Sequence, residues 1–328
     1  MTAQPVAPLH RRRSILGLAI AALVVASACT TSGGLGTVPP PPATPTPAPS
    51  QPGGPDLAPA PSVPVAPSPS DGPTASPSGP AASPTPVETI IVRTYGVLPG
   101  EVGVEGLVPT LQVIPATTGV ARAAIEQLLA GRLADGVSSS IPAGTRLLGL
   151  SIKDRVATID LSKEFETGGG SASSFYRLGQ VVYTLTQFST VGSVLFQVDG
   201  RTVTTFGPEG IVLDGPQARA DYEDLLPAIF VDRPAYGAAI GNPARITGNA
   251  NVFEATLQVT ILDGSGRVVY EDFATATCGT GCRGTFDVTA GYSVAKAQWG
   301  TLRVWVASAR DGLPENVRDY PVWLTPAS

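Results

Sequence analysis

A β-hairpin is the element that the pattern of apolar and polar residues predicts most clearly. Between Ile141 and Phe165, apolar and polar residues alternate in two runs that are separated by Asp154-Arg155. A period of two is typical of a strand with one buried face. A two-residue turn at Asp154-Arg155 would place three apolar pairs on one face of the hairpin. These pairs are Leu148 with Leu161, Leu150 with Ile159, and Ile152 with Ala157.

Two helix patterns flank the hairpin and can cover its apolar face. The first follows Thr117-Thr118, and the second follows Gly168-Gly169-Gly170, where Ser171 or Ser173 can cap a helix. Their apolar positions repeat at helical spacing: Val120, Ala124, Ile125, Leu128, Leu129 and Leu133 in the first, and Phe175, Leu178, Val181, Val182, Leu185 and Phe188 in the second.

Further strands are expected on both sides of the helices. The β-branched and aromatic runs are Thr89–Tyr95, Leu107–Ile114, Val194–Val198 and Thr202–Phe206, and the last two would pair around Asp199-Gly200. The predicted fold of this part is therefore α+β, with two helices against one mostly antiparallel sheet.

Beyond an acidic connector, Gln217–Leu226, the pattern changes to short strands without helical periods. The seven candidates are Ile229–Val231, Ala244–Thr247, Ala255–Leu262, Arg267–Phe273, Gly284–Val288, Gly300–Ala307 and Arg318–Leu324. This spacing predicts an all-β sandwich. The change of texture across the connector favours two independently folding units.

Both parts resemble known families. The stretch IPAGTRLLGLSIKDRVATIDLSKEF with VVYTLTQFSTVGSVLFQVDG resembles the GerMN domain over about residues 88–214. Arg233-Pro234 and NPARITGNA (242–250) with VFEA (252–255) resemble the immunoglobulin-like domain of bacterial spore germination over about residues 228–326. The resemblance implies a link to sporulation, germination or cell-wall processes. It also implies a likeness to ring-building domains, and hence self-association.

The N-terminus has the pattern of a secretory signal peptide over residues 1–28. Arg11–Arg13 precede a short apolar run, and small residues and Cys29 follow it. The sequence Ala26-Ser27-Ala28-Cys29 fits a bacterial lipoprotein box, in which Cys29 carries the lipid, and it also fits ordinary A-x-A cleavage. We favour the lipoprotein, which places the protein on the outer face of the cell membrane.

Residues 29–86 contain the lipid-anchor cysteine and then a Pro/Ala/Ser-rich segment. Positions 30–86 hold 19 of the 33 prolines. Such a composition cannot bury a core, so a disordered spacer is expected. The domain limits follow: 87–215 for the GerMN domain, 216–227 for the connector and 228–328 for the immunoglobulin-like domain.

Charge and histidine content exclude several functions. Loss of residues 1–28 removes three of the 21 basic residues and none of the 26 acidic ones, which leaves 18 against 26 and a net charge of −8. No nucleic-acid partner is expected of so acidic a chain. The same cleavage removes His10, the one histidine, so a Ser-His-Asp triad, a Cys-His pair and most zinc sites are excluded.

The best carboxylate cluster is Asp160, Glu164 and Glu166. Paired carboxylates could hydrolyse wall glycans if they were held about 5–10 Å apart. A solvated strand and loop is the preferred interpretation. Ser162-Lys163 and the pair Ser151 and Lys153 fall on hairpin edges, where a lysine is solvated rather than buried.

Two further patterns have a structural and a functional interpretation. Asp263 with Ser265 lacks the repeated acids and terminal Glu of a calcium loop, so a turn is preferred. Trp299, Trp305 and Trp323 could form a carbohydrate platform, but aromatic residues that alternate in a sandwich are more often core. We therefore expect them to be buried.

Cys278 and Cys282 enclose a flexible Gly-Thr-Gly, and in an exported domain they are expected to form a disulfide. No metal or cofactor is expected. The sequence thus predicts a non-catalytic, lipid-anchored envelope protein whose partners are the membrane, peptidoglycan or envelope proteins. The alternatives are a peptidoglycan-acting enzyme that uses the Asp/Glu cluster and a wall-polysaccharide binding module that uses exposed tryptophan.

Overall fold

The computed structural model describes residues 88–101 and 104–327. The expected signal peptide, the expected lipidation site Cys29, the expected spacer and His10 all lie outside these residues. Within them, no helix has both the length and the apolar character that crossing a bilayer requires.

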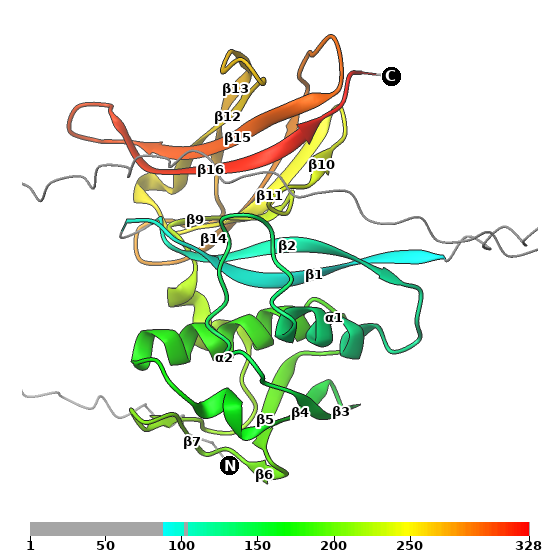
Figure 1. The fold of residues 1–328 in the computed structure, drawn as a ribbon. Coiled ribbons are helices and arrows are strands. Elements are labelled where there is room, and N and C mark those ends of the chain that lie inside the picture. The colour runs from blue at the N-terminus through cyan, green and yellow to red at the C-terminus, as the bar shows by residue number, and fades with distance from the viewer. Residues whose placement is uncertain (1–87, 102–103, 328) are drawn as a thin grey trace, which may run out of the picture. The chain divides into compact units, whose positions relative to one another are not determined.

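The N-terminal α+β domain places two helices between a hairpin and a sheet (Figure 1). Strands β1 (Thr89–Leu98) and β2 (Gly106–Pro115) form the hairpin on one side of the helices. The helices are α1 (Val120–Leu129) and α2 (Ser171–Leu185). On their other side lies a four-stranded sheet made of β3 (Leu147–Lys153), β4 (Val156–Leu161), β5 (Ser193–Val198) and β6 (Arg201–Thr202).

This sheet is mostly antiparallel, as predicted, but its central pair is parallel. Strands β4 and β5 run in the same direction because α2 connects them as a crossover, and the outer pairs β3–β4 and β5–β6 are antiparallel. A short 3₁₀ helix, η1 (Lys163–Glu166), precedes α2. Of the predicted strand Thr202–Phe206, only Thr202 lies in β6 and pairs with β5. The next residues form β7 (Thr205–Phe206), which pairs with β8 (Ile211–Val212).

The central hairpin has the predicted turn but a different register at one end. Asp154 and Arg155 both have positive φ, as a primed two-residue turn requires. Ile152 faces Ala157 as expected, but Leu161 faces Leu147 instead of Leu148. The reason is a bulge between Leu147 and Gly149, which adds a residue to β3 and turns Leu148 outward, where 47% of it is exposed.

The helices begin without the predicted side-chain caps. Gly119 is the N-cap residue of α1, and the Thr117 hydroxyl accepts a hydrogen bond from its amide. Gly170 is the N-cap residue of α2, so Ser171 is already helical. Phe175, at the start of the second predicted stripe, is 39% exposed. The centres of both stripes are buried as predicted: Ala124, Ile125 and Leu128 from α1, and Leu178, Val181, Val182 and Leu185 from α2.

The C-terminal half is a sandwich of two sheets, as predicted. One sheet has the order β14-β11-β9 and the other has the order β10-β16-β15-β12-β13. Their bounds are β9 (Ile229–Arg233), β10 (Ala239–Ile240), β11 (Ala244–Ala250), β12 (Thr256–Leu262), β13 (Val268–Thr275), β14 (Gly284–Ala290), β15 (Gln298–Ala307) and β16 (Pro314–Leu324), with a short 3₁₀ helix η3 (Phe253–Ala255) before β12. Each of the seven predicted strands is present, and β10 is additional.

The three tryptophans are not core residues, which corrects the expectation from the sequence. In β15 the buried face consists of Leu302, Val304 and Val306, so Trp299 and Trp305 occupy the opposite face. Trp323 likewise alternates with buried residues of β16. Trp299 is 54% exposed and the other two are half-buried. The error arose because both faces of these strands carry apolar residues, and alternation alone does not tell which face the second sheet covers.

Candidate functional site

The two domains meet along β9, whose side chains alternate between the two cores. Ile229 and Val231 point into the sandwich core, whereas Phe230 belongs to the core of the α+β domain, where its ring lies 6.4 Å from that of Tyr183. Asp232 follows on the same side as Phe230. One face of β9 is thus covered by its own domain and the other by the neighbouring domain.

The free edge of β1 is closed by side chains of α2 and the residues just after it. The amide of Gln187 accepts from the backbone N–H of Arg93 and donates to its carbonyl. The Thr184 hydroxyl accepts from the N–H of Tyr95, and Gln180 donates to the carbonyl of Tyr95. Because buried backbone groups need partners, this row of side chains substitutes for a missing neighbouring strand.

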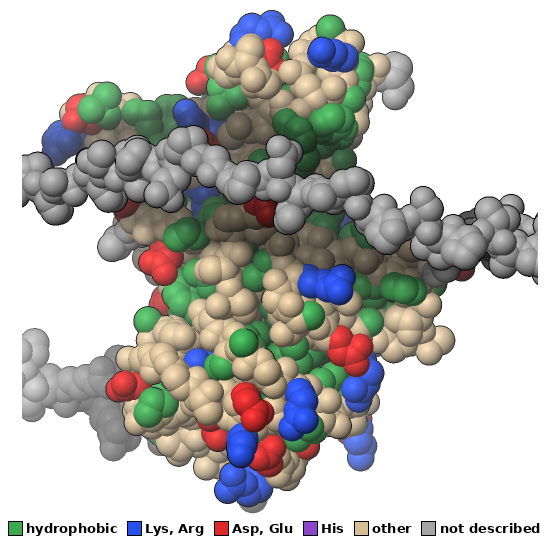
Figure 2. Space-filling view, viewed as in Figure 1, with side chains coloured by type: hydrophobic (Ala, Val, Ile, Leu, Met, Phe, Trp, Pro, Cys, Tyr) green, Lys and Arg blue, Asp and Glu red, His purple; other side chains and the backbone are tan. Residues whose placement is uncertain are grey.

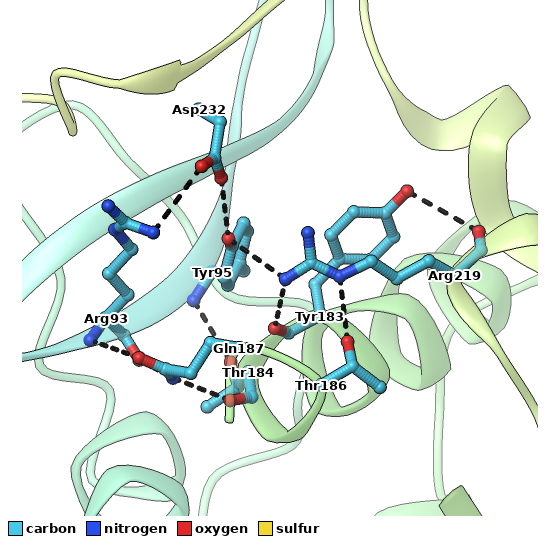
Figure 3. A network of polar contacts seen from close by, with 8 residues as sticks. All are labelled: Arg93, Tyr95, Tyr183, Thr184, Thr186, Gln187, Arg219 and Asp232. Carbon is cyan, nitrogen blue, oxygen red and sulfur yellow. Dashed lines mark hydrogen bonds and ion pairs between the residues drawn. The ribbon is translucent and has the colours of Figure 1, made fainter. Parts of the chain in front are cut away.

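At the centre of the junction, the Tyr95 hydroxyl joins the two domains (Figure 3). It donates to Oδ1 of Asp232 at 3.2 Å and accepts from Nη2 of Arg219 at 3.3 Å. Arg93 adds an ion pair to Oδ2 of Asp232 at 3.5 Å. Burial raises the pKa of Tyr95, so the phenol stays protonated and keeps donating at neutral pH.

Arg219 belongs to the connector, which is a folded element rather than an open link. The 3₁₀ helix η2 (Arg219–Leu225) packs against α2 and buries Tyr222. The guanidinium of Arg219 lies 4.6 Å from the ring centroid of Tyr183 and 5.5 Å from that of Tyr95. It also donates to the Thr186 hydroxyl and to the carbonyl of Tyr183. Nη1 of Arg219 has no hydrogen-bond partner among the residues that the structure describes.

Two more arginines join the domains through backbone carbonyls. Arg318, which is 2% exposed, donates from the sandwich to the carbonyls of Val104, Gly106 and Leu107 at the turn of the β1–β2 hairpin. Arg283 donates to the carbonyls of Leu226 and Pro227 and to Oδ1 of Asn249. Burial lowers the pKa of Arg283. Together these contacts make the described residues one compact unit.

Beside this junction lies an open groove of about 630 Å³, which we call the junction groove. Its lining includes outward residues of β11 and β14 beyond the part of the sheet that the α+β domain covers: Arg245, Thr247, Asn249, Thr285 and Asp287. Arg219 and Asp232 line it from the junction, and Thr275 and Thr277 come from the end of β13 and the residues after it. Clefts between domains are where ligand sites often occur, and this volume is within their usual range.

The charges of the junction groove are paired. Arg245 holds Asp287 through Nη2–Oδ2 at 2.6 Å and Nε–Oδ1 at 3.1 Å, and these hydrogen bonds lower the pKa of Asp287 and raise that of Arg245. Elsewhere, on the face that Figure 2 shows, basic and acidic side chains are interspersed around the β3–β6 end of the molecule. No single sign of charge dominates that face.

Comparison with known proteins identifies both domains. Residues 97–204 match the family model Germane, described as sporulation and spore germination, and residues 228–313 match Gmad2, the immunoglobulin-like domain of bacterial spore germination. The chain carries a Germane domain followed by a Gmad2 domain. No curated protein matches it.

Solved structures of sporulation proteins are similar to the chain at low identity. The first GerMN domain of the sporulation protein GerM from Bacillus subtilis is 23% identical, with a TM-score of 0.35, and the match covers 40% of this chain and 99% of that chain. The tandem GerMN domains of the same protein are 16% identical, with a TM-score of 0.37, and the match covers 74% of this chain and 62% of that chain.

In the Germane domain, one member of the predicted carboxylate cluster, Asp160, has a hydrogen-bond partner, whereas Oε2 of Glu164 is buried without one among the described residues. Oδ1 of Asp160 accepts a hydrogen bond from the N–H of Gly200 at 2.9 Å and so holds the β5–β6 turn. The Ser162 hydroxyl is the main cause of a lowered pKa at Glu164. A general acid in glycoside hydrolysis needs a raised pKa, so the environment of Glu164 is unsuited to that role. Glu166 is in η1, and Lys153 and Lys163 are exposed.

In the Gmad2 domain, Asp263 forms a turn, as predicted. Its carboxylate accepts from the Ser265 hydroxyl and from the N–H groups of Ser265 and Arg267, and the first of these is the largest cause of a pKa lowered to about 2. Among the residues that the structure describes, no cluster of three or more His, Cys, Asp or Glu could hold a metal ion. Cys278 and Cys282 form a disulfide, with their Cα atoms 5.8 Å apart.

Sequence reasoning missed the junction residues. Two signals could have found them. Arg93 and Tyr95 interrupt the apolar run of β1 with polar groups on one face, and Gln180, Thr184 and Gln187 follow each other at helical spacing. Nothing in the sequence, however, joins these positions to Asp232, which lies 137 residues after Tyr95.

Proposed function

We propose that this chain is an exported, lipid-anchored cell-envelope protein with a non-catalytic binding or scaffold role in sporulation, germination or cell-wall processes. The observation that carries the proposal is the tandem of two germination-associated domains, at residues 97–204 and 228–313. The signal-like N-terminus and Cys29 support the export and anchoring parts of the proposal.

In the proposed mechanism, the chain holds its two domains at a distance from the membrane, where they can bind a partner. The lipid on Cys29 holds the chain at the membrane, and the Pro/Ala/Ser-rich residues 30–86 carry the two domains away from it. Tyr95, Arg219 and Arg318 keep the two domains in one arrangement. A fixed arrangement lowers the entropy that a partner must remove on binding. The partners are peptidoglycan or other envelope proteins, and a second copy of the chain.

Three observations support a non-catalytic role. Neither family description names an enzymatic activity. Asp160 is occupied in a turn, and the pKa of Glu164 is lowered rather than raised. Cleavage at Cys29 would also remove His10.

Two measurements test the proposal. The unaltered chain should partition into detergent after export, and Cys29→Ala should stay in the aqueous phase. The full chain should also cosediment with purified peptidoglycan or an envelope fraction without releasing muropeptides or reducing ends. Aqueous partitioning of both forms would refute the anchor. Release that Asp160→Asn or Glu164→Gln abolishes, in a folded protein, would establish the enzyme instead.

A wall-polysaccharide binding module is the second candidate function. The outward position of Trp299, Trp305 and Trp323 on one sheet favours it, because exposed aromatic rings stack on flat apolar faces of ligands. Trp299→Ala should then weaken cosedimentation with wall polysaccharide. Unchanged binding by that variant would remove the tryptophan surface from consideration.

A further inference from the structure

We propose that the junction groove binds a neutral, hydroxyl-rich saccharide. This inference rests on the proposed wall-associated function and names the ligand class and the site. The groove lies beside the contact between the Germane and Gmad2 domains, and its lining comes from both β11–β14 of the sandwich and Arg219 of η2. Apart from Arg219, which belongs to the connector helix η2, the lining comes from the Gmad2 domain.

The charges of the groove favour a neutral ligand. Two arginines, Arg219 and Arg245, are balanced by two carboxylates, Asp232 and Asp287. The Arg245–Asp287 pair is bidentate, and Asp232 accepts from the Tyr95 hydroxyl. An anion would be attracted by the guanidinium groups and repelled by nearby carboxylates at similar range, so the groove has little net preference for charge.

The unpaired hydrogen-bonding groups of the groove match the groups of a sugar. Among the described residues, the hydroxyls of Thr247 and Thr275 have no hydrogen-bond partner, and neither does Nη1 of Arg219. Asn249 accepts from Arg283 through Oδ1, which leaves its Nδ2 to donate. The groove therefore offers both donors and acceptors, with which the hydroxyl and acetamido groups of a glycan can pair.

A peptide ligand fits the groove less well. Specific peptide recognition needs pockets for alternate side chains. The aromatic residues of the lining, Phe230 and Phe286, are 1% and 4% exposed, so they lie beneath the surface and offer no apolar pocket. On the tryptophan surface, the rings of Trp299 and Trp323 meet edge to face with centroids 5.4 Å apart, so one face of one of these two rings is already covered.

The test is isothermal titration calorimetry of the full chain in detergent with chitotetraose, a neutral tetramer of N-acetylglucosamine. The double variant Thr247→Val, Thr275→Val removes two free hydroxyls and keeps side-chain shape, so the fold should be retained. The matched control is Thr289→Val, an exposed threonine of β14 outside the groove. We expect the double variant to bind roughly tenfold or more weakly, and the control to bind like the unaltered chain.

Several results would overturn the inference. The first is that the unaltered chain does not bind chitotetraose, and the second is that the double variant binds it as tightly as the unaltered chain. The third is that Trp299→Ala loses chitotetraose binding while the double variant keeps it. The fourth is that the groove binds inorganic phosphate more tightly than the sugar. Backbone chemical-shift changes on the unaltered chain provide a second readout that no substitution can disturb, and they must fall on β11 and β14.

The groove and the proposed function can fail separately. Suppose that the unaltered chain binds chitotetraose, that the double variant no longer binds it, and that the unaltered chain does not cosediment with wall material. The groove inference then stands, and the wall-associated role is refuted. If the double variant cosediments as well as the unaltered chain and neither binds chitotetraose, the wall-associated role stands and the groove inference falls.

Discussion

Removal of the Tyr95 hydroxyl should destabilise both domains, although Tyr95 belongs to only one of them. Tyr95→Phe keeps the ring and therefore its packing against Tyr183, 5.4 Å away, and against Arg219. It removes the donor to Asp232 and the acceptor for Arg219. The perturbation is thus confined to two hydrogen bonds with charged partners.

The expected cost is about 2 kcal/mol. Hydrogen bonds to charged groups contribute roughly 1.5–3 kcal/mol each. Both bonds are long, at 3.2 and 3.3 Å, and both partners keep another contact, Asp232 with Arg93 and Arg219 with the carbonyl of Tyr183. The expected cost is therefore set below the sum of two such bonds, which would be about 3 kcal/mol at its low end. The control Tyr270→Phe removes a half-buried hydroxyl that has no side-chain hydrogen bond among the described residues, and it should cost less than about 0.5 kcal/mol.

Two probes follow the domains separately during urea unfolding. All three tryptophans, Trp299, Trp305 and Trp323, are in the Gmad2 domain, so their fluorescence reports its unfolding. The two α-helices of the described residues are in the Germane domain, so far-ultraviolet circular dichroism near 222 nm reports mainly that domain. If the junction couples the domains, both midpoints should coincide in the unaltered chain and shift together in Tyr95→Phe. A shift of the helical signal alone, or a change no larger than that of Tyr270→Phe, would refute the coupling.

The remaining predictions concern a close contact, a crosslink and a carboxylate. Gly106 has φ +155°, and an added Cβ would lie 2.7 Å from the carbonyl oxygen of Leu225. Gly106→Ala should therefore lower the free energy of unfolding in urea by about 2 kcal/mol or more. The control Gly237→Ala, also at positive φ but in open space, should lower it less. Intact mass before and after reduction shows whether the Cys278–Cys282 disulfide is present. Its reduction should lower the free energy of unfolding by at most about 2 kcal/mol, because the loop that it closes is short. Because the pKa of Asp263 is lowered to about 2, its carboxylate stabilises the fold above the unfolded pKa near 4, and this stabilisation is lost as the pH falls toward 2. The free energy of unfolding of Asp263→Asn should therefore depend less on pH between about pH 5 and 2. An unchanged pH dependence would contradict this prediction.

The sequence predicted the elements better than it predicted how they meet. Both helix stripes, the turn at Asp154-Arg155 and the seven sandwich strands follow from periodicity, which depends only on local backbone geometry. The register at Leu148 did not, because Leu147 and Leu148 are both apolar and a bulge decides which one faces the core. The tryptophans were misplaced for a related reason: the alternation in β15 fixes two faces but not which face the other sheet covers.

The candidate site was out of reach for a different reason. Its members come from a strand, a connector and a second domain, and the Arg93–Asp232 ion pair spans 139 positions. The connector also looked like a solvated acidic link, yet Arg219 and Tyr222 make it a packed element. Such contacts depend on tertiary packing, which a single sequence does not encode in any local period.

Because the groove and the junction share Arg219 and Asp232, ligand binding and domain coupling should be linked. A ligand that binds only the joined arrangement stabilises it by RT ln(1 + [L]/Kd), which is about 2.7 kcal/mol at a hundredfold excess over Kd. Chitotetraose should therefore raise both unfolding midpoints together in the unaltered chain, and less so in Thr247→Val, Thr275→Val. Substitution of Arg219 could not give this information, because the same guanidinium packs on Tyr183 and holds the junction. The threonine hydroxyls separate the two roles, since they line the groove without fastening the domains.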